Sequence, residues 1–278
     1  MTDDDKPVGE RAEVMDVGGV RLYVSVRPGS AEHPPLLLVN GLGANLEMLD
    51  PFVDAFAEVS AERTGTIRLD LPGIGGSPAR LRPMRVSGLA RLVDRLLVEL
   101  GHEQADVLGV SWGGGLAQQF AYQHPHRCRR LVLVSTSTGA ISIPGRPSAL
   151  LQLASPLRYL RPSRLKDLGP LLYGREYQDN PEVARLHASL MRAPSLPGYY
   201  AQLYAVAGWT SLFWLHRVRQ PTLILAGSDD PLVPACNAVL MARRLPNATL
   251  RVVNGGHLFL VAQARAMAPI VHRFLRAL

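Results

Sequence analysis

The stretch that decides the fold is Ala105-Asp-Val-Leu-Gly-Val-Ser-Trp-Gly-Gly-Gly-Leu-Ala-Gln-Gln-Phe120. Its first six residues read as a strand, and the residues from Trp112 onward read as a helix. The junction matches the pattern G-x-S-x-G, whose glycines allow a very tight turn that exposes the serine at the helix N-terminus. Backbone N–H groups at such a terminus stabilise negative charge. We therefore predict that Ser111 is a nucleophile and that the N–H of Trp112 is an oxyanion donor.

Apolar runs on both sides of this turn predict further strands at residues 35–39, 66–69, 131–134, 222–226 and 249–253. Helical patterns occur at about residues 86–100, 112–124, 234–244 and 262–278. Continuous apolar strands that alternate with helices are typical of an α/β fold, in which helices flank both faces of a mostly parallel sheet. Near the start, residues 13–16 and 21–27 flank Gly18-Gly19, which predicts an antiparallel hairpin at the sheet edge.

The alternation stops between residues 140 and 220. This segment contains eight prolines and several helical stretches, and it shows no convincing strand pattern. We interpret it as a helical lid, or cap, inserted in the core. The predicted core then comprises residues 1–139 and 221–278.

A serine nucleophile requires a general base, and the base requires a carboxylate that orients it. On this type of sheet the chain order is serine, acid, histidine. His257 follows the last predicted strand in a glycine-rich loop, whereas His272 lies inside the final helix. The strand at 222–226 is followed by Asp229 and Asp230, and we prefer Asp230 because it lies directly before a proline at the apex of the turn.

The second oxyanion donor is expected in the loop after the strand at 35–39, which reads Asn40-Gly-Leu-Gly43. The flanking glycines let the backbone of Leu42 approach a substrate carbonyl oxygen. Leu42 is therefore the predicted donor. Asn40 is a candidate substrate-binding residue in the same loop.

Composition narrows the function further. The chain of 278 residues has a formal net charge of +7, and its two cysteines cannot form a disulfide framework or a four-cysteine zinc site. The first residues are acidic and lack the apolar segment of a secretory signal, and no apolar run is long enough to span a membrane. We expect a cytoplasmic protein. The high charge alone would suggest a nucleic-acid partner, but no nucleic-acid motif accompanies it, so we expect no such partner.

Taken together, these features resemble the α/β-hydrolase superfamily over essentially the whole chain, including the segment Asp70-Leu-Pro-Gly-Ile-Gly-Gly-Ser77. Many members have His-Gly where this chain has Asn40-Gly41. Longer strings resemble the intracellular depolymerases of medium-chain-length poly(3-hydroxyalkanoates): Asn40-Gly-Leu-Gly-Ala-Asn-Leu-Glu47, Gly109-Val-Ser-Trp-Gly-Gly114, Leu116-Ala-Gln-Gln-Phe120, Gly208-Trp-Thr-Ser211, Trp214-Leu-His216 and Gly256-His-Leu-Phe-Leu260.

This resemblance implies hydrolysis of a storage polyester at granules through an acyl-enzyme on Ser111, with Asp230 and His257 completing the triad. The chemistry requires no metal or organic cofactor. A carboxylesterase or lipase for small or medium-chain esters is the alternative, since it shares every catalytic residue named. A C–C bond hydrolase, a proline iminopeptidase and an inactive binding protein on the same scaffold are further alternatives, although an inactive protein usually lacks one triad residue and this chain has all three.

The predicted lid is rich in aromatic and basic residues. It contains nine of the chain's 17 aromatic residues, most of which we expect to form the lid's own core. Candidates for contact with an acyl chain or a granule are Tyr199, Tyr200, Trp209 and Trp214. Ten basic and four acidic residues give the lid an excess of six positive charges, so nearly all of the net charge lies there. This distribution suggests that the basic lid docks on an anionic granule surface or attracts carboxylate-ended oligomers. A solvated basic surface is the alternative.

Overall fold

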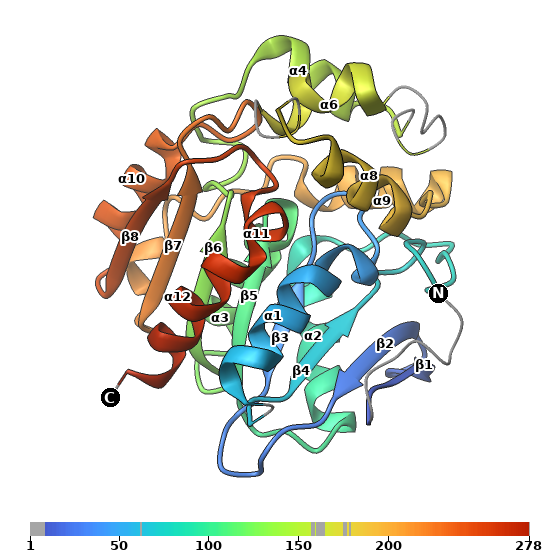
Figure 1. Ribbon diagram of the computed structural model, residues 1–278. Helices are drawn as coiled ribbons and strands as arrows, with labels where there is room; N and C mark the ends of the chain where they lie inside the picture. Colours follow the sequence, from blue (N-terminus) through green and yellow to red (C-terminus); the bar gives the residue numbers. More distant parts are fainter. Residues whose placement is uncertain are drawn as a thin grey trace.

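The computed structural model describes residues 9–61, 63–156, 159, 165–174, 177 and 179–277. Within these residues, one sheet of eight strands has the order β1-β2-β4-β3-β5-β6-β7-β8 (Figure 1). The strands are β1 (Arg11–Asp16), β2 (Arg21–Arg27), β3 (Leu36–Val39), β4 (Thr66–Leu69), β5 (Ala105–Val110), β6 (Cys128–Val134), β7 (Thr222–Gly227) and β8 (Ala248–Val253). From β4 to β8 every neighbouring pair is parallel, and β1 and β2 form the predicted antiparallel hairpin.

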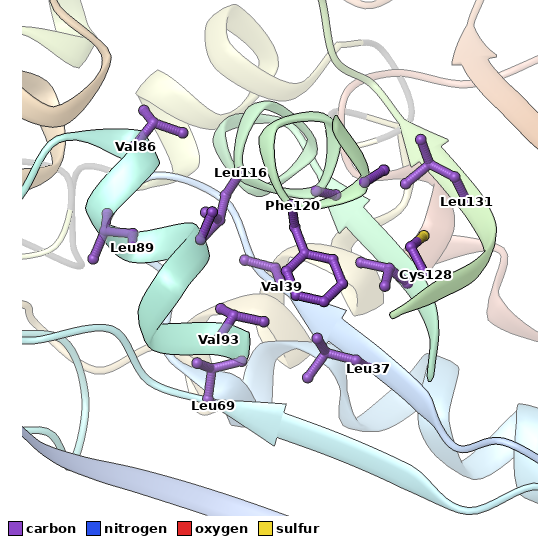
Figure 2. Close-up of a cluster of buried hydrophobic side chains, with 14 of the residues drawn as sticks. Leu37, Val39, Leu69, Val86, Leu89, Val93, Leu116, Phe120, Cys128 and Leu131 are labelled. Carbon is purple, nitrogen blue, oxygen red and sulfur yellow. The ribbon is translucent and has the colours of Figure 1, made fainter. Parts of the chain in front are cut away.

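Helices cover both faces of the sheet, as the alternating pattern predicts. The helices that pack on the sheet are α1 (Asp50–Ser60), α2 (Val86–Glu99), α3 (Trp112–Gln123), α10 (Cys236–Arg244), α11 (Phe259–Ala262) and α12 (Ala264–Arg276). In Figure 1, α1, α11 and α12 lie in front of the sheet, whereas α2 and α3 lie behind it. Figure 2 shows the rear layer, where Leu89 and Val93 of α2 and Phe120 of α3 pack against Leu37 and Val39 of β3.

Two helical features differ from the prediction. Helix α1 has no counterpart among the predicted helices, although Pro51 occupies a first-turn position that favours a helix start. The predicted helix at 262–278 corresponds to α12, which begins at Ala264. The residues just before it form the separate turn α11, because Gln263 adopts a non-helical backbone conformation (φ −116°, ψ 34°) between the two.

Most of the residues between β6 and β7 form a separate layer, here called the insert (residues 140–220). Its helices are α4 (Pro147–Leu153), α6 (Leu165–Tyr173), α8 (Pro181–Leu190) and α9 (Leu196–Val206), with the 3₁₀ turn η4 (Leu215–Arg217). In Figure 1 these four helices gather at the upper end of the sheet. A small cluster of Ala149, Leu172, Tyr173 and Tyr177 packs on Leu232, which belongs to the loop after β7. The insert therefore packs directly on a loop of the core.

Strand order determines which loops can meet. Strand β3 lies between β4 and β5, and the chain leaves β3 toward α1 on one face but leaves β5 toward α3 on the other. Such a switch opens a crevice at the carboxyl ends of the two strands. The loop after β3 and the serine after β5 consequently lie beside each other.

No helix in the described ranges combines the length and apolarity needed to cross a membrane.

Candidate active site

Ser111 occupies the turn between β5 and α3 in a strained backbone conformation, with φ 53° and ψ −117°. Non-glycine residues rarely adopt positive φ, and such strain is concentrated at functional sites. The glycines of the motif are required by close approach. A methyl group on Gly113 would lie 2.3 Å from the carbonyl oxygen of Val39, and one on Gly109 would lie 2.5 Å from that of Gly113. The turn thus depends on contact between α3 and the end of β3.

Ser111, His257 and Asp230 form a hydrogen-bonded chain. The Nε2 atom of His257 lies 3.0 Å from the Oγ of Ser111, and its Nδ1 lies 2.7 Å from the Oδ2 of Asp230. The second carboxylate oxygen of Asp230 accepts the N–H groups of Leu232 and Val233, each at 2.9 Å. Asp230 therefore fixes the imidazole with Nδ1 protonated, which leaves Nε2 to accept the serine proton. His257 and Asp230 are both more than nine-tenths buried.

The competing residues lie outside this chain. Asp229 is partly exposed and faces the guanidinium of Arg146 at 3.5 Å. His272 lies on α12, where its ring packs edge-on against Phe56 with 6.0 Å between the ring centres. Burial, with Arg276 nearby, lowers the pKa of His272 below its ordinary value. The geometry thus joins Ser111 to the preferred aspartate and histidine rather than to their alternatives.

The two predicted oxyanion donors flank Ser111. Trp112 begins α3 directly after the serine, and Leu42 lies in the loop after β3. A methyl group on Gly41 would lie 3.5 Å from the Cβ of Ser111 and 4.0 Å from its Oγ, so this loop is in contact with the serine. Both Leu42 and Trp112 line a cavity that reaches Ser111.

Asn40 lines the first of two cavities at Ser111, and its side chain also holds the loop in place. Its side-chain oxygen accepts the N–H of Gly41, and its side-chain nitrogen donates to the carbonyl of Asn45, both at 2.8 Å. Asn45 is fully buried and bonds the insert in turn, donating to the carbonyl of Leu190 and accepting the N–H of Arg192. The loop after β3 is therefore tied to the end of α8.

Asp70 anchors the same loop from β4. Its carboxylate accepts the N–H of Leu46 at 2.7 Å and the N–H of Gly76 at 2.8 Å. Burial raises the pKa of Asp70 to about 7, although these two hydrogen bonds oppose the shift. The segment from Asp70 to Gly76 thus fixes the turn at the upper end of the sheet.

Two cavities meet at Ser111. They share Leu42, Ser111, Leu153 and Leu232. The first has a volume of about 80 Å³ and includes His257, and its apolar lining comes from Met48, Leu49, Val110, Tyr159, Tyr173, Val183, Leu186, Leu258, Leu260 and Val261. The second has a volume of about 370 Å³ and includes Trp112, and its lining includes Ile143, Leu150, Leu203, Val206, Trp209 and Val233. An ester bound at Ser111 would thus have an apolar surface on each side.

The four aromatic candidates occupy different positions. Trp209 lines the second cavity, and its indole N–H donates to the side chain of Gln119 at 2.7 Å. The described lining of the two cavities does not include Tyr199, Tyr200 or Trp214. Tyr199 is completely buried, Tyr200 is half exposed, and Trp214 stacks on a tyrosine of α3 with 4.4 Å between the ring centres.

Sequence reasoning did not select the insert residues that line the first cavity. Tyr159, Tyr173 and His187 lie there beside His257. The carbonyl of Tyr173 also accepts the backbone N–H of His257 at 2.9 Å, so the end of α6 holds the histidine loop. Tyr159 and Tyr173 belong to the aromatic set of the insert, but nothing in their spacing indicates which side chains face the serine.

Within the described ranges, no group of three or more His, Cys, Asp or Glu side chains could hold a metal ion.

Comparisons with known proteins agree with this fold. The family model described as alpha/beta hydrolase fold matches residues 34–262. A poly(3-hydroxyalkanoate) depolymerase from Ectopseudomonas oleovorans is 49% identical over 255 residues, which cover 92% of this chain and 89% of the relative. The crystal structure of a hydrolase from Pseudomonas aeruginosa is 28% identical, with a TM-score of 0.80 over 98% of this chain and 100% of the other. An enol-lactonase structure from Burkholderia xenovorans, 21% identical, shares the fold with a TM-score of 0.82 over 95% of this chain and all of that one.

Proposed function

The chain belongs to the α/β-hydrolase family, and we propose that it is a serine hydrolase that cleaves ester bonds of medium-chain-length poly(3-hydroxyalkanoate) or its oligomers. The observation that carries this proposal is the hydrogen-bonded chain of Ser111, His257 and Asp230 at the junction of two apolar cavities. A nucleophile, a base and an orienting acid in this arrangement are what acyl transfer through a serine requires.

The geometry supports the following reaction. His257 takes the proton of Ser111 through Nε2 while Oγ attacks the ester carbonyl carbon. The resulting oxyanion accepts the N–H groups of Leu42 and Trp112. His257 then protonates the departing 3-hydroxyl oxygen, which leaves an acyl-enzyme on Ser111. A water molecule, deprotonated by the same histidine, releases the acid. Asp230 stays ionised and stabilises the imidazolium in both steps.

The two cavities support a substrate that is apolar on both sides of the scissile bond. In a poly(3-hydroxyalkanoate), each of the two units joined by an ester carries its own alkyl side chain. One cavity would take the side chain of the acyl unit, and the other would take that of the alcohol unit. The relative at 49% identity is named as a depolymerase of this polymer class, which supports the same assignment.

We assign the insert the role of a lid over this site, because its helices contribute lining residues to both cavities. We also propose that the enzyme acts in the cytoplasm at storage granules, where its basic insert faces the granule surface. Some of the charge lies outside the described residues: Arg158, Arg161, Arg164, Arg175 and Glu176.

The test combines two substrates. Purified protein is assayed on 4-nitrophenyl esters of graded chain length and on suspensions of medium- and short-chain polyester. We expect clearing of the medium-chain suspension, and we expect Ser111→Ala to remove both activities with the fold unchanged by circular dichroism. Ester cleavage without clearing would replace the proposal with a carboxylesterase. Absence of both activities, together with no labelling of Ser111 by a serine-directed phosphonate, would favour a binding protein.

A further inference from the structure

Gln202 of α9 connects the insert to both segments that provide the proposed oxyanion donors. Its side-chain Oε1 accepts the N–H of Gly43 at 2.7 Å, next to Leu42. Its backbone carbonyl accepts the indole N–H of Trp112 at 2.9 Å. Gln202 is only 4% exposed, so these bonds form away from competing water. One residue outside the triad therefore bonds to both sides of the oxyanion hole.

The peptide between Leu42 and Gly43 is held at both ends. Its N–H donates to Gln202, and its carbonyl accepts the hydroxyl of Tyr159 at 2.7 Å. Because a peptide unit is planar, fixing both polar ends fixes its orientation. The preceding peptide carries the Leu42 N–H, and its carbonyl, that of Gly41, accepts the N–H of Ala44 at 3.2 Å. With both peptides at the Leu42 α-carbon held, the direction of the Leu42 N–H is restricted.

Gly43 makes this arrangement possible. It has φ +72°, a conformation that favours glycine, and a methyl group there would lie 2.7 Å from the ring of Tyr159 and 2.9 Å from that of Tyr199. The loop therefore packs directly against aromatic rings of the insert. Any shift of Gly43 would break the bond to Gln202 or collide with these rings.

Helix α9 is anchored to the core at both ends, so Gln202 has a fixed position. At its start, Ser195 donates its backbone N–H and its hydroxyl to the carbonyl of Gly73, at 3.0 and 2.9 Å. A methyl group on Gly198 would lie 2.3 Å from the same carbonyl oxygen, so helix and turn are in direct contact. At its end, the guanidinium of Arg85 donates to the carbonyls of Tyr204 and Ala207, each at 2.7 Å.

We propose that Gln202 is a positioning residue for the oxyanion hole: it orients the Leu42 N–H through Gly43 and holds Trp112 through its indole. This proposal rests on the proposed serine-hydrolase function. The role of α9 is then to hold the oxyanion donors in place, and not only to cover the substrate. This role does not depend on movement of the rest of the insert. Loss of the Gln202 acceptor should therefore lower kcat more than it raises KM.

The experiment compares Gln202→Leu with Gln202→Glu, which retains an acceptor oxygen, and with Gln220→Leu as a matched control. Gln220 is also a buried glutamine, but its amide donates to the carbonyls of Ala121 and Pro125. The readouts are kcat and KM on a soluble 4-nitrophenyl ester, Ki for a trifluoromethyl ketone whose adduct places an oxyanion in the hole, and thermal stability.

For Gln202→Leu we expect kcat to fall by about tenfold or more, since complete loss of one oxyanion donor costs about 10²- to 10³-fold. We expect KM to change less than about twofold, and Ki for the trifluoromethyl ketone to rise with the loss in kcat/KM. Gln202→Glu keeps the acceptor oxygen but adds a buried negative charge near the oxyanion, so it should restore only part of kcat. Gln220→Leu should lower stability but leave both kcat and Ki near their original values.

Tyr159→Phe provides a second test if Gln202→Leu does not fold. It removes the bond at the other end of the same peptide, and it should lower kcat in the same direction by a smaller factor. The proposal is overturned if folded Gln202→Leu or, in its place, folded Tyr159→Phe retains the original kcat and ketone affinity. Failure of the proposed function would look different, because the unmodified protein would then lack ester hydrolysis and phosphonate labelling.

Discussion

At the scale of single residues, Asp229 and Asp230 are adjacent carboxylates with very different surroundings. Asp230 bonds to His257 and to two backbone N–H groups, whereas Asp229 faces Arg146 at the surface. We expect Asp230→Asn to lower kcat by about 10³- to 10⁴-fold, because an amide no longer selects the reactive histidine tautomer. Asp229→Asn should stay within about threefold of the original enzyme. Initial rates on a 4-nitrophenyl ester measure both effects, and a larger loss in Asp229→Asn would reverse the assignment of the acid.

The same residues show how far the sequence predicts the site. Ser111, Asp230 and His257 follow β5, β7 and β8 at short distances, so parallel strands bring them to one end of the sheet. Gln202 and Tyr159 lie in the insert, and the strand order does not determine where their side chains point. Their direction depends on how the insert packs on the core. A signal for Gln202 exists, since it is a polar residue on the buried face of α9, otherwise formed by Gly198, Tyr199 and Ala205.

At the scale of elements, Asp70 connects the end of β4 to the turn before α1. Its pKa is raised to about 7 from 3.8 by burial. Between about pH 4 and pH 7 the native state therefore holds a proton that the unfolded chain has lost, and the free energy of unfolding should fall as pH rises through this window. Asp70→Asn removes this titration. Urea unfolding of both proteins at several pH values should show the stability of the original protein, relative to the variant, declining from about pH 4 to pH 7. A constant or rising difference would contradict the prediction.

The strands could be predicted well because burial on both faces makes them continuous apolar runs, as in β3, β5 and β7. Helix α1 was not predicted, because its apolar pattern is weak. Its largest buried side chains are only Phe52, Val53 and Phe56, and it follows a 3₁₀ turn (η2, Leu46–Leu49) whose apolar residues obscure the start of the helical period. The break between α11 and α12 is set by the backbone at Gln263, where neither glycine nor proline marks it.

At the scale of the whole molecule, charge is distributed unevenly. The net charge is +7, and the insert has an excess of six basic residues over acidic ones. Part of this charge pairs with the core: Arg192 bonds to Glu47 at 2.9 Å, and Arg146 faces Asp229. These pairs hold the insert to the core, whereas an exposed residue such as Arg185 on α8 contributes to the field outside the molecule.

If the insert contacts an anionic granule surface, binding should depend on salt and on where a charge is placed. Adsorption to a medium-chain polyester suspension should weaken as salt rises from about 0.01 M to about 1 M, because the screening length falls from about 30 Å to about 3 Å. A basic residue near an anionic surface contributes about 1 kcal/mol, so Arg185→Glu should weaken adsorption by about fivefold or more.

Arg251→Glu is the matched control, since it changes the net charge equally on the exposed edge strand β8, outside the insert. Cosedimentation at each salt concentration measures binding, and hydrolysis of a soluble ester should be unaffected by either variant. Equal weakening by both variants would indicate attraction to the net charge alone, and adsorption unchanged by salt would exclude docking through charge.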